Sequence, residues 1–207
     1  MDQPAISALP LFPLSLVLLP GQSMPLHVFE PRYRAMLARA MDTDQLIGFP
    51  TPMAPSPEGS DQPVLYPLFG VGRVCAHREL EDGRSYILVQ YAGCARMVEE
   101  LPLDPGGFRV ARGEWIPEVT GPVPQGPLIK ALLSQLLPED RTVRTSFERL
   151  SERDPAEMLC MVADMALVDL TDRLAFLEAR SQSDRGALVH MRLAERLTWT
   201  GQPVGEA

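Results

Sequence analysis

Residues 9–34 read L-P-L-F-P-L-S-L-V-L-L-P-G-Q-S-M-P-L-H-V-F-E-P-R-Y-R, and the rest of the chain is organised around them. The apolar run from Leu14 to Leu19 lies between Pro13 and Pro20. Continuous apolarity over so short a run predicts a strand that is buried on both faces. Pro20 and Gly21 predict a turn, because proline fixes φ and glycine accepts a positive φ.

A helix is predicted to start at Pro31, since proline fits the first helical position, where no N–H is needed. Glu30 precedes it, where a carboxylate meets the positive end of the helix dipole. The residues that follow form one apolar helical stripe: Tyr33, Met36, Leu37, Ala40 and Met41. We expect the helix to end near residues 42–44.

This stretch resembles the start of the amino-terminal substrate-recognition domain of Lon-type ATP-dependent proteases. That family has an L-F-P strand, a P-G turn and a P-L-x-h-F-E-P-R-Y segment, in which h is aliphatic. The matching residues here are Leu11, Phe12, Pro13, Pro20, Gly21, Pro25, Leu26, Phe29, Glu30, Pro31, Arg32 and Tyr33. The resemblance extends over about residues 9–198 and is strongest at the front. It indicates the kind of domain better than it indicates an activity.

A series of strands is predicted after the helix, over Leu46–Phe49, Phe69–Ala76, Tyr86–Tyr91 and Phe108–Ile116. Asp82-Gly83 predicts a hairpin turn between the second and third of these. Such a series forms an antiparallel meander with one helix, which would close as a small barrel or sandwich. With the resemblance, the prediction is an α+β protein: an N-terminal antiparallel β-barrel-like (PUA-like) domain with one helix, then a C-terminal α-helical bundle.

The segment from Pro50 to Pro67 carries six prolines and is predicted to be a surface loop, since too many backbone donors are missing for a sheet interior. Loops often carry binding residues. We therefore take Phe49, Tyr66 and Phe69, which flank or end this loop, as the candidate peptide-binding residues.

Prolines and glycines between residues 117 and 127 break all periodicity and mark a domain boundary. We predict a β-rich domain over 1–118 and a helical bundle over 125–200. Helical spacing covers 128–137, a further short helix is expected within 141–150, and Asp154-Pro155 is a strong helix start. Methionines 158, 161 and 165 share one helical face, which indicates core more often than a binding surface.

Composition excludes several classes of function. The 207 residues carry 27 Asp plus Glu against 19 Lys plus Arg, a net charge of −8, and Lys130 is the only lysine. This balance argues against nucleic acid as the main partner. Three widely spaced cysteines indicate neither a zinc site nor a disulfide framework. The apolar start lacks a basic region and is interrupted by prolines, so we expect no signal peptide, no membrane span and a cytoplasmic location.

Catalytic motifs are missing from the sequence. A Lon protease also needs an ATPase and a Ser-Lys peptidase, but no G-x-x-x-x-G-K-[ST] occurs, and Lys130 has no serine partner. His27, His77 and His190 are scattered over three segments, with neither a G-x-S-x-G elbow nor a paired-histidine metal motif. We predict no enzymatic activity, no cofactor and no metal. Glu30 with Arg32 or Arg34 indicates an ion pair at the strand-to-helix corner more than a peptide clamp.

Three functions stay open at this point. The first, implied by the resemblance, is a non-catalytic module that binds unfolded or extended polypeptide, with capture for a separate protease as one extension. The second is a nucleic-acid-binding PUA-like module, which rests on fold analogy alone. The third is an uncharacterised small-molecule-binding protein, which would need a concave pocket with convergent polar groups. The motif residues Pro20, Gly21, Phe29, Glu30, Pro31, Arg32 and Tyr33 are expected to be structural.

Overall fold

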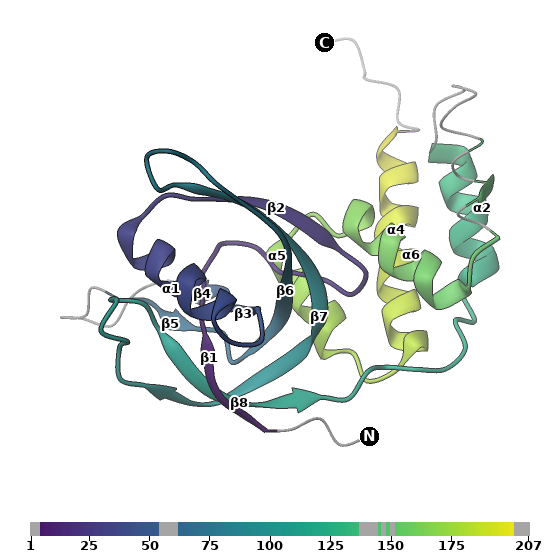
Figure 1. The fold of residues 1–207 in the computed structure, drawn as a ribbon. Coiled ribbons are helices and arrows are strands. Elements are labelled where there is room, and N and C mark those ends of the chain that lie inside the picture. Colours follow the sequence, from purple (N-terminus) through teal and green to yellow (C-terminus); the bar gives the residue numbers. More distant parts are fainter. Residues whose placement is uncertain (1–4, 54–61, 137–144, 146–147, 150–151, 201–207) are drawn as a thin grey trace, which may run out of the picture. The chain divides into compact units, whose positions relative to one another are not determined.

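The computed structural model describes residues 5–53, 62–136, 145, 148–149 and 152–200. Its internal contacts divide the chain into two compact units, residues 1–118 and residues 119–207. Within the described ranges, the first unit holds all the strands and one helix, and the second unit is helical (Figure 1). The predicted short helix within 141–150 falls mostly outside the described residues.

The first unit contains β1 (Ile6–Pro10), β2 (Ser23–Val28), α1 (Pro31–Met41), β3 (Leu46–Phe49), β4 (Pro52–Met53), β5 (Val64–Leu65), β6 (Leu68–Glu79), β7 (Ser85–Leu101) and β8 (Val110–Ile116). The second unit contains α2 (Gly126–Leu136), α4 (Pro155–Ala166), α5 (Leu170–Glu178) and α6 (Gln182–Thr200).

Six strands form an antiparallel sheet: five lie in the order β1-β8-β7-β6-β3, and the sixth, β2, pairs with β7 off this path. The long strand β7 pairs with β6 on one side; on the other side its first half pairs with β2 and its second half with β8. The edges β1 and β3 meet at a single parallel bridge between Leu11 and Gly48. The fold is therefore α+β, but among the described residues the sheet does not close into the expected barrel.

The helix α1 begins at Pro31 and is followed by Asp42 at its C-cap, as predicted. Its buried residues Met36, Leu37 and Ala40 belong to the same apolar cluster as residues from the sheet and the connecting segments. These partners are Phe12, Leu18, Val28, Ile47, Phe49, Val74, Ile87, Val89, Phe108 and Val110. The 3.6-residue periodicity of α1 thus supplies one side of the core of the first unit.

The prediction of a strand over Leu14–Leu19 is wrong. The strand of this region is β1, which ends at Pro10, before the apolar run begins. The apolar run is irregular, although Val17, Leu18 and Leu19 are buried. Prolines at both ends remove backbone donors, and single hydrogen bonds replace a ladder: Thr51 Oγ1 donates to the Leu16 carbonyl at 2.9 Å. Apolarity therefore predicted the burial of Val17, Leu18 and Leu19 but not the strand, and Ser15 is exposed.

The proline-rich segment, predicted to be a surface loop, contains regular structure at both ends. Its arms pair as the short antiparallel strands β4 and β5, with Pro52 opposite Leu65. Residues 54–61 between them lie outside the described ranges. The hairpin predicted at Asp82-Gly83 is present, and Gly83 has a φ of +76°, a conformation that glycine adopts without steric cost.

In the second unit, α2, α4 and α5 each contact α6. Asp154 caps α4 as predicted, its Oδ1 accepting a hydrogen bond from the Ala156 N–H at 2.8 Å. The apolar interior contains Ile129, Leu133, Met158, Leu159, Val162, Phe176, Val189 and Leu193. None of the helices within the described ranges has the length and apolarity that crossing a bilayer requires.

Candidate functional site

The strand-to-helix corner after β2 carries an exposed ion pair. Arg32 Nη2 lies 2.8 Å from Glu30 Oε2, and the Arg32 guanidinium lies over the Tyr33 ring at 4.6 Å. The Tyr33 ring in turn contacts Phe12, with ring centroids 4.4 Å apart. Burial raises the pKa of Tyr33, partly offset by Arg32. The corner therefore anchors α1 to the core, and Glu30 with Arg32 forms the predicted ion pair.

Next to this corner, three rings form a group that we call the aromatic cluster: His27, Phe29 and Tyr86. The His27 imidazole stacks on Tyr86 with ring centroids 4.6 Å apart, and it lies 5.6 Å from the Phe29 ring. Phe29 is 57% exposed and Tyr86 52% exposed. His27 Nε2 is buried and has no hydrogen-bond partner among the described residues. Two large rings thus stand in solvent around a half-buried histidine.

Strand alternation explains why the cluster faces outward. His27 is opposite Tyr86 in the β2–β7 register, and side chains on opposite residues share one face. Ile87 and Val89 point to the core, so Tyr86 and Leu88 point away from it. Leu88, which is 38% exposed, continues the apolar surface beside the cluster.

The strand β2 is a free edge that is interrupted by a proline. The Tyr91 N–H donates to the Gln22 carbonyl at 2.9 Å, which fixes the alternation of the ladder: residues 24, 26 and 28 turn their backbone groups to β7. Residues 23, 25 and 27 turn theirs outward, where the described chain supplies no further strand. Pro25 has no N–H, so this edge offers fewer donors to an added strand.

The predicted peptide-binding residues lie elsewhere. Phe49 is 1% exposed and Phe69 is 2% exposed, so both rings are core residues in this structure, in two different apolar clusters. Tyr66 is half-buried, and its N–H donates to the Thr51 carbonyl at 2.8 Å. Of the motif residues, Pro20 is buried, and Gly21 forms the turn with a φ of +78°. The structure does not bring the three predicted residues together at the surface.

His77 has a neighbour that the sequence did not indicate. Its Nε2 lies 3.0 Å from the Oγ of Ser85 on the adjacent strand. No carboxylate is hydrogen-bonded to His77 in the described part of the chain, so the pair does not complete a Ser-His-Asp arrangement. Within the same ranges, no three His, Cys, Asp or Glu side chains gather as a metal site would require.

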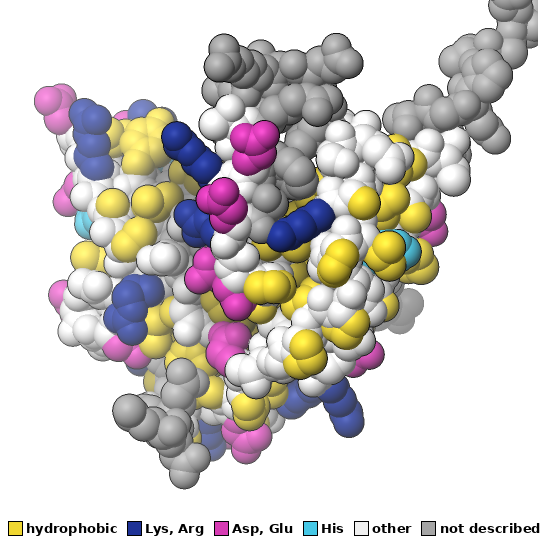
Figure 2. Space-filling view, turned by 90° about the vertical axis from the view of Figure 1, so that its right-hand side faces the viewer, with side chains coloured by type: hydrophobic (Ala, Val, Ile, Leu, Met, Phe, Trp, Pro, Cys, Tyr) yellow, Lys and Arg dark blue, Asp and Glu magenta, His cyan; other side chains and the backbone are white. Residues whose placement is uncertain are grey.

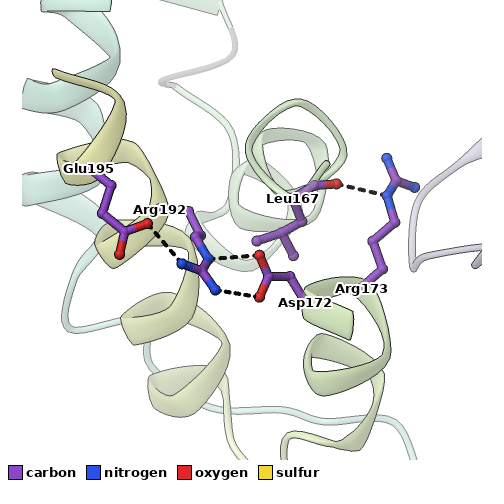
Figure 3. Close-up of polar contacts among 5 residues, drawn as sticks. All are labelled: Leu167, Asp172, Arg173, Arg192 and Glu195. Carbon is purple, nitrogen blue, oxygen red and sulfur yellow. Dashed lines mark hydrogen bonds and ion pairs between the residues drawn. The ribbon is translucent and has the colours of Figure 1, made fainter. Parts of the chain in front are cut away.

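A polar network joins α5 and α6 in the second unit (Figure 3). Arg192 donates from Nε and Nη2 to Asp172, each at 2.7 Å, and from Nη1 to Glu195 at 2.8 Å. The hydrogen bonds that Arg192 donates, first to Asp172 and then to Glu195, raise the pKa of Arg192 above its usual value. These groups line a cavity of about 550 Å³ with Val168 and Arg196, among others. Because these three charges are paired with one another, the network is best explained as a link between helices.

The methionine face of α4 is only partly core. Met158 is buried, whereas Met161 is 45% exposed and Met165 is 51% exposed, so the prediction of a core stripe is wrong for two of the three. The burial stripe instead runs through Leu159, Val162, Ala163 and Ala166. On the face shown in Figure 2, hydrophobic side chains lie between charged ones and form no uninterrupted surface.

The fold defines a class of α+β domain in which a mostly antiparallel sheet precedes several helices. Residues 8–195 match the family model described as the ATP-dependent protease La (LON) substrate-binding domain. The chain belongs to this family.

Individual relatives agree with that assignment. A Lon protease of Elusimicrobium minutum (strain Pei191) is 25% identical over 194 residues, which cover 87% of this chain but only 22% of the length of that relative. A crystal structure of a Lon N-terminal domain protein from Xanthomonas campestris has a TM-score of 0.63 at 21% identity, covering 94% of this chain and 99% of the other.

The N-terminal domain of a Lon protease from the Mycobacterium avium complex has a TM-score of 0.70 at 12% identity, covering 91% of this chain and 99% of that one. At these identities both structures support the fold alone. The chain spans about a fifth of the length of the Elusimicrobium protein, and the family to which it belongs is described as a substrate-binding domain.

Sequence reasoning missed the aromatic cluster as a site, although two signals pointed to it. Phe29 was included only as a structural motif residue, yet it directly precedes Glu30 at the charged corner where the chain leaves the sheet. Tyr86 alternates with the apolar residues Ile87 and Val89 and therefore belongs to the opposite face of β7. Only the pairing of β2 with β7 shows that the two rings are neighbours.

Proposed function

We propose that this chain is a non-catalytic polypeptide-recognition module, in which the aromatic cluster contacts apolar side chains of extended or unfolded substrates. Membership of a substrate-binding family supports the ligand class. The observation that carries the location is the pair of rings at 57% and 52% exposure, set side by side around His27. Rings of this kind contribute much of the energy at binding surfaces.

Side-chain contacts, more than backbone pairing, supply the recognition in this proposal. The outward edge of β2 lacks one donor at Pro25, which weakens the addition of a further strand. Apolar contacts tolerate many sequences, as expected of a module that meets unfolded chains. Delivery of captured chains to a separate protease extends the proposal, and the packing of α2, α4 and α5 on α6 supports a helical bundle in the second unit.

Fluorescence anisotropy with a labelled, reduced and alkylated unfolded polypeptide tests the location. The double variant Phe29→Ser/Tyr86→Ser is expected to bind about tenfold more weakly than the parent protein, since two anchoring rings are lost. Val98→Ser is the matched control, because Val98 is 59% exposed on the second half of the same strand β7. Equal affinity of the parent and the double variant, with both folded by circular dichroism, would contradict the proposal.

A further inference from the structure

A second feature of the first unit is the seam between the two sheet edges, β1 and β3. Just after β1 the edges are held together: the Phe12 N–H donates to the Gly48 carbonyl at 2.8 Å, and the Leu14 N–H to the Pro50 carbonyl at 3.3 Å. Continuing this parallel ladder backwards would require the residue two before Phe12 to donate to the Leu46 carbonyl. That residue is Pro10, which has no N–H, so the pairing stops there.

The backbone of Leu46 faces this open part of the seam. The Val74 N–H donates to the Gln45 carbonyl at 2.9 Å, so the backbone of Gln45 faces β6. Because backbone groups alternate along a strand, the N–H and carbonyl of Leu46 face away from β6. The Leu46 N–H is already used, because it donates to Asp44 Oδ1 at 3.2 Å. The Leu46 carbonyl therefore remains as an acceptor directed toward β1.

A cavity of about 350 Å³ lies at this open part, and we call it the seam pocket. Its lining includes the whole of β1, with Asp44, Leu46, Arg73 and Trp115. Trp115 is half-buried and packs on the backbone of Gly93, where an added Cβ would lie 2.7 Å from the indole ring. The volume is at the small end of the roughly 300–1,000 Å³ of ligand pockets, which suits a few residues of extended chain and excludes a folded element.

Arg73 is the cation of the seam pocket, and its charge is not paired with a carboxylate in the described ranges. Its Nη1 donates to the Asp44 backbone carbonyl at 2.6 Å, which uses one of the five donors of the guanidinium. Arg109 and Arg39 in the same unit, in contrast, each pair with a carboxylate. The one acidic side chain in the pocket, Asp44, is engaged by the Leu46 N–H. The remaining donors of Arg73 fit a bidentate anion such as a carboxylate.

We propose that the seam pocket binds the carboxyl-terminal residues of an extended polypeptide, with Arg73 holding the terminal carboxylate. Trp115 supplies an apolar wall for the last side chains, and the Leu46 carbonyl accepts a backbone N–H that Pro10 cannot provide. The proposal rests on the proposed function for its ligand class, since it takes polypeptide as the ligand. It adds a site with a preference for chain ends, separate from the aromatic cluster.

Two short peptides of the same apolar sequence test this preference, both labelled with fluorescein at the amino end. One ends in a free carboxylate and the other in an amide. With the full chain, the free-carboxylate peptide is expected to bind about tenfold more tightly by anisotropy, the scale of a charge-assisted bidentate pair. Arg73→Gln is expected to remove the difference. Arg78→Gln, an exposed arginine on the same strand outside the pocket, is expected to keep it.

Trp115 gives a second readout that does not depend on a variant of Arg73. The chain has two tryptophans, so Trp199→Phe leaves Trp115 as the only indole, and its emission is expected to shift when an unlabelled free-carboxylate peptide is added. Equal affinities for the two peptides, a preference that survives Arg73→Gln, or saturating binding without a change in Trp115 emission would each overturn the proposal.

The two proposals fail in different ways. If neither short peptide binds while the unfolded polypeptide does, the seam pocket is excluded and the recognition function stands. If Phe29→Ser/Tyr86→Ser leaves binding of the unfolded polypeptide unchanged but the carboxylate preference persists, the aromatic cluster is excluded and the seam pocket stands. Absence of binding by every peptide and polypeptide overturns both.

Discussion

Arg192 donates two hydrogen bonds, each 2.7 Å long, to the two carboxylate oxygens of Asp172, which lies 20 residues earlier on a different helix. Asp172 is almost fully buried, and Arg192 is partly exposed. The pair therefore connects α5 to α6 at a place where an unpaired carboxylate would be poorly solvated. Bidentate geometry also fixes the relative direction of the two side chains.

Replacement of Asp172 by Asn is expected to lower the thermal unfolding midpoint by several degrees, because one charged partner of a partly buried pair is lost. Glu195→Gln is the comparison, since Glu195 bonds the same arginine from an exposed position and exposed pairs contribute little. Differential scanning calorimetry of the three proteins measures the effect. A loss for Glu195→Gln as large as that for Asp172→Asn would show that burial does not set the contribution.

The caps of α4 and α5 offer a matched pair. Asp154 accepts a hydrogen bond from the Ala156 N–H, whereas Asp169, at the N-cap of α5, makes no such bond. Asp154→Ala is expected to reduce the free energy of unfolding by about 1 kcal/mol, and Asp169→Ala by clearly less. Urea unfolding followed by circular dichroism gives both values. Equal losses would assign the effect to helix-dipole charge and not to the capping bond.

Gly70 allows β6 to approach the irregular apolar segment. A Cβ at this position would lie 2.3 Å from the Leu18 carbonyl oxygen, which is backbone and cannot move aside alone. Gly70→Ala is expected to cost about 1–3 kcal/mol in unfolding free energy, as overpacking does. Gly126→Ala is the control, because its Cβ would have 4.0 Å to Pro155. An unchanged denaturation midpoint for Gly70→Ala would show that the segment around Leu18 adjusts freely.

Ionisation of the half-buried Tyr33 hydroxyl is expected to lower the stability of the fold at alkaline pH. Burial raises its pKa above 10.0, so between the unfolded and folded pKa values the unfolded chain has lost the proton that the folded chain keeps. The unfolding free energy therefore falls as pH rises through this window. Urea unfolding at about pH 9 and about pH 11 is expected to show a smaller decline in Tyr33→Phe than in the parent protein. Identical declines would mean that Tyr33 ionises alike in both states.

Turn and helix-start residues in the sequence correctly predicted those parts of the fold that depend on backbone preferences of a few neighbouring residues. Pro31 placed the start of α1, Asp82-Gly83 placed the hairpin between β6 and β7, and Asp154 placed the start of α4. Each depends on a backbone preference that acts within a few residues. Leu46–Phe49 was also predicted with the bounds that β3 has.

Elements that depend on distant partners were missed. The strand β1 has a short and mixed sequence, and it exists because β8 pairs with it more than one hundred residues later. Phe49 and Phe69 were chosen for their place beside a proline-rich loop, but the pairing of β4 with β5 and the fold of β6 turn both rings inward. The aromatic cluster likewise needs the register between β2 and β7. The residue pattern within one strand does not determine which residues of another strand lie opposite it.

Pro25 has a consequence for the behaviour of the protein at high concentration. Unfolded polypeptide segments at high concentration stack readily as cross-β ribbons, and an unbroken outer strand would give them a template. Because the Pro25 nitrogen carries no hydrogen, the outward edge of β2 lacks a donor at its middle and is a poorer template for such stacking.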